Sequence, residues 1–387
     1  RSDHGRSVLG ICRPHLADPV HRRLPGLIMM KNQYRENTSM LSPSSSRPSQ
    51  GKGSGLGFFA VLLLLSLLTA YPVLIQAQTT PIIISHRGAS GYLPEHTLAA
   101  KVLAYGMGAD YIEQDVVLTA DNIPVVLHDI HLDTVTDVKE KYPDRSRDDG
   151  RFYAIDFTLA EIKTLRVHER TDIRSGNTIY PDRFPTGKST FAVPTLAEEI
   201  ELIQGLNQST GKNVGIYPEI KNPAWHREQG KDISVIILKT LTDYGYTNEN
   251  SKVYLQCFDP DELKRIRFEL KTRIKLVQLL GQNFNTMVTP QGLQGLSSYV
   301  QGIGPSIWHL VTGKNEAGQF NITPIAKNAR AAGLVVHPYT FRVDALPPYV
   351  DHYDDLLQLF YIDIGVEGLF TDFPDRTMGF LKKNGLR

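Results

Sequence analysis

Short apolar runs alternate with amphipathic segments from residue 82 to residue 371, and this alternation most restricts the possible folds. Short apolar runs bounded by polar or turn residues are typical of buried strands, and apolar residues at helical spacing predict helices between them. The expected strands are 82–85, 111–117, 214–219, 253–257, 274–278, 304–309, 333–337 and 368–371. The expected helices are 95–105, 195–204, 233–243, 259–270, 290–300, 323–332 and 353–364. Strands and helices in this order predict an α/β fold, the TIM (β/α)8 barrel.

The spacing of the expected strands is regular except at one place. Most successive strands begin at intervals that are normal for a βα unit. A much longer stretch separates the strand that begins at residue 111 from the one that begins at residue 214. We therefore expect an insertion subdomain after the second strand, over about residues 130–213, in a barrel domain that spans 78–387. A further extended piece is expected at 124–128.

The region before the barrel has two parts of different composition. Residues 1–57 show no clear periodicity and become rich in Ser, Pro and Gly, so they predict a disordered leader. Part of this leader is expected not to belong to the natural protein. Residues 58–77 begin with an apolar run and contain Pro72 and Ala77. This pattern predicts a cleaved signal peptide, with an uncleaved membrane anchor as the alternative, because the segment approaches the roughly 20 residues that span a bilayer. Either would export the barrel to the periplasm or the extracellular space.

The charge balance and the cysteines exclude some classes of protein. The chain has 42 Lys and Arg residues against 41 Asp and Glu residues, a net charge of +1, so no surface for nucleic acid is expected. Cys12 and Cys257 are the two cysteines, and Cys12 lies in the expected leader. We therefore expect no intrachain disulfide in the barrel, which argues against a small disulfide-stapled fold.

Acidic residues interrupt two of the expected strands. Glu113 and Asp115 stand two residues apart in one strand, so alternation places both carboxylates on the same face. Two like charges at this spacing are costly unless a cation lies between them, and oxygen ligands favour a hard divalent ion such as Ca²⁺ or Mg²⁺. Glu219 closes the next strand of the barrel and is expected at the same rim.

Basic residues fall at the same strand ends. His86 and Arg87 follow the first strand, His128 closes the extended piece, and Lys221 follows Glu219 at a spacing of two residues. A single histidine at a strand end usually makes hydrogen bonds within a loop, but two histidines beside carboxylates on one rim favour catalysis. The alternative for Lys221 is a plain salt bridge with Glu219.

Three strings stand in order along this region: HRGASGYLPEHT from His86, EQDVVLTADNIPVVLHD from Glu113 and HLDTVTDV from His131. They resemble the glycerophosphodiester phosphodiesterase family, and most closely its periplasmic bacterial-type enzymes. The likeness runs from about residue 82 to residue 376. It implies a barrel whose mouth is covered by an insertion subdomain.

The resemblance also implies an activity, the hydrolysis of glycerophosphodiesters such as glycerophosphocholine to sn-glycerol 3-phosphate and an alcohol. The cofactor would be a divalent cation, with Ca²⁺ favoured over Mg²⁺. The implied metal ligands are Glu113, Asp115 and Glu219. The implied acid–base pair is His86 and His128, and the implied phosphate-binding residues are Arg87 and Lys221. It stays open which histidine is the acid, and whether water or the 2-hydroxyl of the substrate attacks first.

Residues after other strands are expected near the substrate. Gln256 ends the fourth strand and Tyr339 and Phe341 follow the seventh, so all three are expected to line the pocket. The two aromatic residues would form a wall, with packing against a neighbouring loop as the alternative. Asp372 is interpreted mainly as part of a turn, and Glu95 as an acidic residue at a helix start.

Other functions remain as alternatives. A phospholipase D-like enzyme with the same fold would act on lysophospholipids or sphingolipids, but bulky lipids need an open apolar mouth and the insertion favours small soluble diesters. A non-catalytic binding protein would be expected to lack His86, His128 or an acidic ligand. A zinc amidohydrolase would need a His-x-His pair on the first strand, which the sequence does not have.

Overall fold

The computed structural model describes residues 80–281 and 284–387. The expected leader, 1–57, and the expected signal peptide or anchor, 58–77, lie outside these ranges. Among the described residues, no helix combines the length and the apolar character that crossing a bilayer requires.

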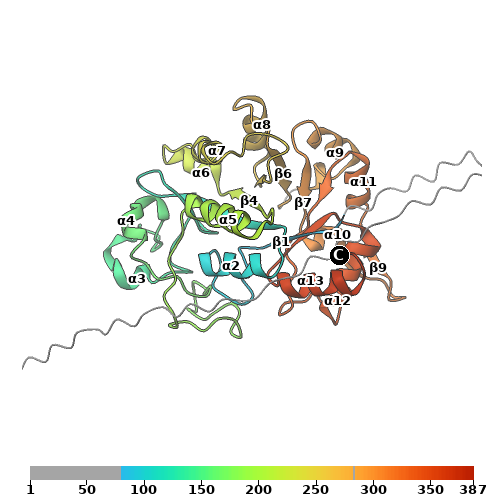
Figure 1. Ribbon diagram of the computed structural model, residues 1–387, viewed down its shortest axis with the longest axis horizontal. Coiled ribbons are helices and arrows are strands. Elements are labelled where there is room, and N and C mark those ends of the chain that lie inside the picture. The colour runs from blue at the N-terminus through green and yellow to red at the C-terminus, as the bar shows by residue number, and fades with distance from the viewer. Residues whose placement is uncertain (1–79, 282–283) are drawn as a thin grey trace, which may run out of the picture. The chain divides into compact units, whose positions relative to one another are not determined.

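A parallel sheet of eight strands, counted over the described residues, forms a nearly closed barrel (Figure 1). Its strands are β1 (Ile82–Ser85), β2 (Tyr111–Leu118), β4 (Gly215–Ile220), β5 (Tyr254–Cys257), β6 (Lys275–Leu279), β7 (Gly302–Gly304), β10 (Val335–Val336) and β11 (Gly368–Thr371). The order across the sheet is β10-β7-β6-β5-β4-β2-β1-β11. Phe341, in the segment after β10, pairs with Thr371 of β11, so this segment bridges the two ends of the sheet. The predicted TIM barrel is confirmed.

Helices surround the barrel (Figure 1), and several begin where the sequence supplies a capping side chain. Thr97, Thr195, Asp259 and Thr289 each accept a hydrogen bond from a backbone N–H of the first helical turn. The helices of the barrel are α2 (Leu98–Gly106), α5 (Leu196–Thr210), α6 (Pro223–Glu228), α7 (Ile233–Asp243), α8 (Pro260–Phe268), α9 (Pro290–Leu296), α10 (Ile307–Leu310), α11 (Ile325–Ala331), α12 (Tyr353–Leu357) and α13 (Pro374–Lys383).

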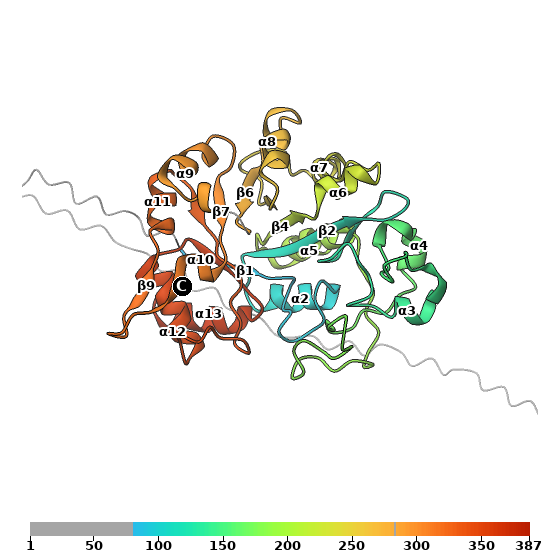
Figure 2. The same ribbon diagram turned by 180° about the vertical axis from the view of Figure 1, so that it is seen from behind.

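The segment between β2 and α5 forms an irregular unit with its own apolar core. It contains β3 (Pro124–Val126), α3 (Val138–Lys141), η1 (Pro143–Arg145), η2 (Ala154–Asp156) and α4 (Leu159–Ile162). β3 pairs antiparallel with β2, and Val117 and Leu127 join the core of the unit, so the unit continues from the barrel wall. Figure 2 shows α3 and α4 at the side of the barrel next to β2.

The strand β2 is buried along its whole length and yet contains polar residues. All of its residues are buried, as expected for a parallel strand that is covered on both faces. Such strands are normally apolar throughout, yet β2 carries Glu113, Gln114 and Asp115 in its middle. Buried polar groups need partners. Glu113 and Asp115 share one face of the strand and mark a site, whereas the Gln114 side chain accepts a hydrogen bond from the Tyr217 N–H.

Several expected elements differ from the structure. The expected strand 304–309 is wrong after Gly304, because the Ser306 side chain accepts a hydrogen bond from the Trp308 N–H and starts α10 there. The expected helix 95–105 begins only at Leu98, so Glu95 lies in the preceding loop. Two further elements follow α10 and α12: a hairpin of β8 (Val311–Lys314) and β9 (Phe320–Ile322), and a π-helical turn, η4 (Gln358–Ile364). A short 3₁₀ turn, η3 (Phe284–Thr286), precedes α9.

Candidate active site

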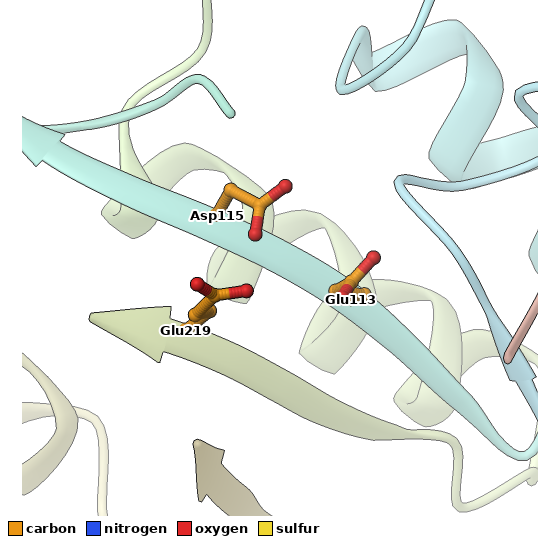
Figure 3. Close-up of side chains that lie close together, drawn as sticks. All are labelled: Glu113, Asp115 and Glu219. Carbon is orange, nitrogen blue, oxygen red and sulfur yellow. The ribbon is translucent and has the colours of Figure 1, made fainter. Parts of the chain in front are cut away.

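Three carboxylates converge at the carboxyl-terminal part of β2 and β4. Asp115 lies directly opposite Glu219 in the register of the two strands, and Glu113 precedes Asp115 by two residues on the same face. Figure 3 shows the three side chains on the same side of these strands. Each offers one oxygen, and these oxygens all lie within 4.8 Å of one another. All three residues are buried.

The electrostatics of this acidic triad fit a bound cation. Burial, together with the charge of Asp115, raises the pKa of Glu113 well above its usual value. Burial also raises the pKa of Glu219 to about 8, against the opposing charge of Lys221. Asp115 Oδ1 is buried without a hydrogen-bond partner among the described residues. Since a divalent cation would supply the charge and the missing partner, the triad can hold one.

Two side chains, those of Lys221 and His96, contact carboxylates of the triad. The Lys221 Nζ lies 2.7 Å from Glu219 Oε1 and 3.8 Å from Asp115 Oδ1. The His96 Nε2 lies 2.8 Å from Asp115 Oδ2. Burial alone would raise the pKa of Asp115, but Lys221 and the hydrogen bond from His96 hold it well below its usual range. Asp115 is therefore the ionised member of the triad.

His86 follows β1 and is held by a carboxylate from the other end of the chain. Its Nδ1 lies 2.6 Å from Asp372 Oδ1, and its Nε2 lies 3.8 Å from Glu113 Oε2. Burial, with the nearby charge of Arg87, lowers the pKa of His86 to about 4. Asp372 stays ionised, because Arg342 and its other partners outweigh the effect of burial on its pKa. The Nδ1–H therefore donates to Asp372, and Nε2 faces the triad without a proton.

His128 follows β3 and has an equivalent partner beside it in the chain. Its Nδ1 lies 2.7 Å from Asp129 Oδ1. Arg170, from the insertion, contacts Asp129 Oδ2 and also binds both carboxylate oxygens of Glu95. Burial, with the charges of Arg87 and Lys221, lowers the pKa of His128 to about 4. Both imidazoles of the site are therefore neutral at neutral pH.

Arg87 connects the histidines with the acidic triad. Its backbone N–H donates to Glu113 Oε2 at 2.9 Å, and it has a positive φ of 58°. Its Nη1 lies 2.9 Å from Glu95 Oε2, and its Nε lies 3.5 Å from Asp115 Oδ2 without making a hydrogen bond. The guanidinium group is thus held beside the triad, with its Nε–H unpaired among the described residues.

These residues share one cleft of about 350 Å³ at the barrel mouth. Its lining includes both histidines, Arg87, the whole acidic triad, Gln256 and Tyr339. Gln256 Nε2 donates to Glu113 Oε1 at 2.9 Å, and the Tyr339 hydroxyl donates to the carbonyl of Leu280. An apolar side of the cleft is formed by residues of β6, α10 and neighbouring loops: Phe258, Leu279, Ile307, Trp308, Leu346 and Pro347.

The model of the glycerophosphoryl diester phosphodiesterase family matches residues 86–376 of the chain. The chain belongs to this family. A glycerophosphodiester phosphodiesterase of Haemophilus influenzae is 44% identical, over 79% of this chain and 91% of the relative. One of Treponema pallidum is 39% identical, over 78% of this chain and 92% of the relative. The chain is therefore an enzyme, a phosphoric diester hydrolase.

Solved structures show the same fold. A putative glycerophosphoryl diester phosphodiesterase from Silicibacter pomeroyi has a TM-score of 0.61 and 24% identity, over 79% of this chain and 95% of that chain. An Oleispira antarctica phosphodiesterase, solved in complex with the product sn-glycerol-3-phosphate, has a TM-score of 0.53 and 21% identity, over 78% of this chain and 97% of that chain. These likenesses support the barrel architecture of the enzyme.

One expected pocket residue, Phe341, lies elsewhere in the enzyme, whereas another, Lys221, lies beside the acidic triad. Phe341 does not line the cleft, so that expectation is wrong: it is fully buried in the main core, and its ring packs edge-on against Phe360 at a centroid distance of 4.8 Å. Lys221 contacts the carboxylates of the triad and is not among the residues that line the cleft. Tyr339 and Gln256 do line it.

Several contacts of the site were not expected from the sequence. Asp372 binds His86 and is not merely part of a turn. Glu95 binds two arginines and does not act as an acidic residue at a helix start. Arg170 reaches the site from the insertion, and His96 contacts a carboxylate of the triad. The one available signal for Glu95 and His96 is their place in the string that begins at His86.

Proposed function

We propose that the enzyme hydrolyses glycerophosphodiesters such as glycerophosphocholine to sn-glycerol 3-phosphate and an alcohol. Glu113, Asp115 and Glu219 would hold a divalent cation, and His86 and His128 would act as general acid and base. One observation carries the proposal: three carboxylates and two imidazoles line a single cleft. The product named for the Oleispira antarctica phosphodiesterase is consistent with it.

The two histidines have the surroundings that proton transfer requires. Asp372 fixes the proton of His86 on Nδ1, and Asp129 does the same for His128. Each imidazole then presents Nε2 as a proton acceptor. A bound phosphodiester is an anion, so it raises the pKa of both rings and favours the protonated form of the one that gives its proton to the leaving alkoxide.

The phosphate group would be positioned by Arg87. Its Nε is buried and makes no hydrogen bond among the described residues, so it can donate to a phosphoryl oxygen. When bound, the cation supplies positive charge that offsets the negative charge developing on the phosphoryl group. Lys221 would hold Glu219 and Asp115 in position, since its ammonium group contacts both.

A coupled assay of sn-glycerol 3-phosphate release tests the proposal on a chain that begins at Gln78. We expect turnover of glycerophosphocholine, its loss in excess chelator and its return with Ca²⁺ or Mg²⁺. His86→Ala and His128→Ala should each lower kcat by about 100-fold or more, the usual contribution of a general acid or base. Full activity in excess chelator would contradict the metal, and near-normal turnover in either variant would contradict the role of that histidine.

A panel of substrates separates the proposal from its alternative. Diesters with choline, ethanolamine and inositol are compared with a lysophospholipid under the same conditions. We expect the soluble diesters to react with the higher kcat/KM. A preference for the lysophospholipid would favour a phospholipase D-like enzyme, whose acyl chain could pack on the apolar side of the cleft.

We also propose that the barrel is exported, because residues 58–77 have the composition of a signal peptide or anchor. Cell fractionation after expression of the full chain would test this. The barrel should appear outside the cytoplasm, free in the case of cleavage or with the membrane in the case of an anchor. A barrel that stays in the cytoplasm would contradict the proposal.

A further inference from the structure

A second cavity, of about 180 Å³, adjoins the reacting groups. It shares His86, Arg87, His128 and Arg342 with the cleft, so both cavities open on the place where the phosphate would lie. The members of the acidic triad do not line it. Its far wall comes from the insertion and includes Glu169. A phosphodiester carries two esterified alcohol groups, here called its arms. A site with a cavity on either side of the phosphate can receive one arm in each cavity.

The arginines of the second cavity are already paired. Arg183 binds Asp344 and Asp372, and Arg342 also binds Asp372. Arg170 binds Glu95 and Asp129. These guanidinium groups therefore add little free positive charge to the cavity, although they line it.

Glu169 differs from these three arginines because part of its carboxylate is unpaired. It is 4% exposed, and its Oε2 has no hydrogen-bond partner among the described residues. Burial, with the neighbouring charge of Glu95, raises the pKa of Glu169 to about 7. An acceptor that is buried without a partner costs stability, so a ligand that donates a hydrogen bond to it would remove an existing penalty.

We propose that Glu169 accepts a hydrogen bond from a donor-bearing arm of the diester, so that the second cavity selects substrates by their hydroxyl or ammonium groups. This inference rests on the proposed function. The acidic neighbours of Glu169, Glu95 and Asp372, disfavour another anion in the cavity. The two sources of such a donor are the hydroxyls of glycerol and the ammonium group of an ethanolamine head group.

Calorimetric binding of three phosphomonoesters tests the proposal without turnover. sn-Glycerol 3-phosphate carries hydroxyls, phosphoethanolamine carries an ammonium group, and methyl phosphate carries neither. Glu169→Ala should weaken the binding of at least one of the first two by about tenfold or more relative to its effect on methyl phosphate. Glu169→Gln, which keeps an acceptor oxygen, should weaken it less. Glu140→Ala, at an exposed residue of helix α3 in the insertion, is the matched control.

Each result decides the question. Loss for sn-glycerol 3-phosphate assigns the cavity to the glycerol arm, and loss for phosphoethanolamine assigns it to the head group. Equal changes for all three compounds, or no change, would overturn the proposal. Circular dichroism identifies a variant that fails to fold, in which case Glu169→Met, which also lacks an acceptor oxygen, takes the place of Glu169→Ala. Failure of the proposed function would appear separately, as wild-type enzyme that binds these compounds but releases no sn-glycerol 3-phosphate.

Discussion

At the residue scale, the His86–Asp372 pair makes a direct prediction. Asp372→Asn keeps the size of the side chain but removes the charge that holds the His86 proton on Nδ1. We expect kcat for glycerophosphocholine to fall by about tenfold or more, with a smaller change in KM. Asp375→Asn, three residues away and outside the cleft, is the control, because Asp375 accepts a hydrogen bond from the Tyr92 hydroxyl instead. Equal kinetics of the two variants would contradict the pairing.

Glu169 predicts a dependence of stability on pH. Its pKa is raised from 4.5 to about 7, with Glu95, Arg183 and Asp372 as its charged neighbours. The folded state therefore prefers the protonated form, and the stability this provides is present below pH 4.5 and is lost as the pH rises through 7. Relative to wild type, Glu169→Gln should gain thermal stability between pH 5 and pH 8. A difference in Tm between the two proteins that does not change with pH would contradict this.

Sequence alone could predict the acidic triad but not the partners of the histidines. Glu113 and Asp115 are related by strand alternation, and Glu219 by the rule that strand ends share one rim. Asp372 is 286 residues from His86 along the chain, and Arg170 reaches Asp129 from an irregular loop. Such contacts depend on how loops return to the barrel, which no local periodicity encodes.

At the scale of elements, a buried ion pair joins α2 and α5 behind the site. The Lys101 Nζ lies 3.2 Å from Glu199 Oε2 and also contacts His96, and the Lys101 and Glu199 side chains are both fully buried. Removing Lys101 leaves the Glu199 carboxyl buried without its partner, and burial already raises the pKa of Glu199 to about 7. We expect Lys101→Met to lower the free energy of unfolding by about 3–5 kcal/mol.

Urea unfolding of a double variant checks this prediction. Lys101→Met with Glu199→Leu removes both charges and should recover at least half of the loss. Lys239→Met, in an exposed i,i+4 pair with Asp243, is the control and should cost less than about 1 kcal/mol. A double variant less stable than the single one would contradict the account.

The elements that sequence predicted well are those with two independent signals. α5 and α8 have both helical periodicity and a capping residue, Thr195 and Asp259. The expected strand 304–309 had only apolar character, and that could not distinguish a strand from the short helix α10. Tyr339 and Phe341 show a related limit. The backbone around them pairs with different segments, at Ser306 after β7 and at Thr371 of β11. The Tyr339 ring faces the cleft, while the Phe341 ring enters the core.

At the scale of the whole molecule, the barrel and the insertion contribute different parts of the site. The barrel strands position the acidic triad and His86, while the insertion supplies Arg170 and Glu169. The barrel could be predicted because its repeat is regular. The course of the insertion could not, since its elements are short and its core forms from scattered residues. The part of the site that is proposed to determine substrate specificity therefore lies in the segment whose structure is hardest to predict from sequence.

The acidic triad also links metal binding to the stability of the whole barrel. In the metal-free protein, burial and the charge of Asp115 raise the pKa of Glu113 and Glu219, and a cation that binds only the folded state favours their ionised forms and stabilises that state. A cation at about 100 times its Kd should add about 2.7 kcal/mol, or roughly 5 °C in Tm for a domain of this size. Thermal unfolding in chelator and in Ca²⁺ or Mg²⁺ measures this shift. Glu219→Gln should lose most of it relative to its own baseline in chelator, whereas Glu140→Gln should keep it. An equal shift in both variants would mean that the cation binds elsewhere and that the triad is held by Lys221 and His96 alone.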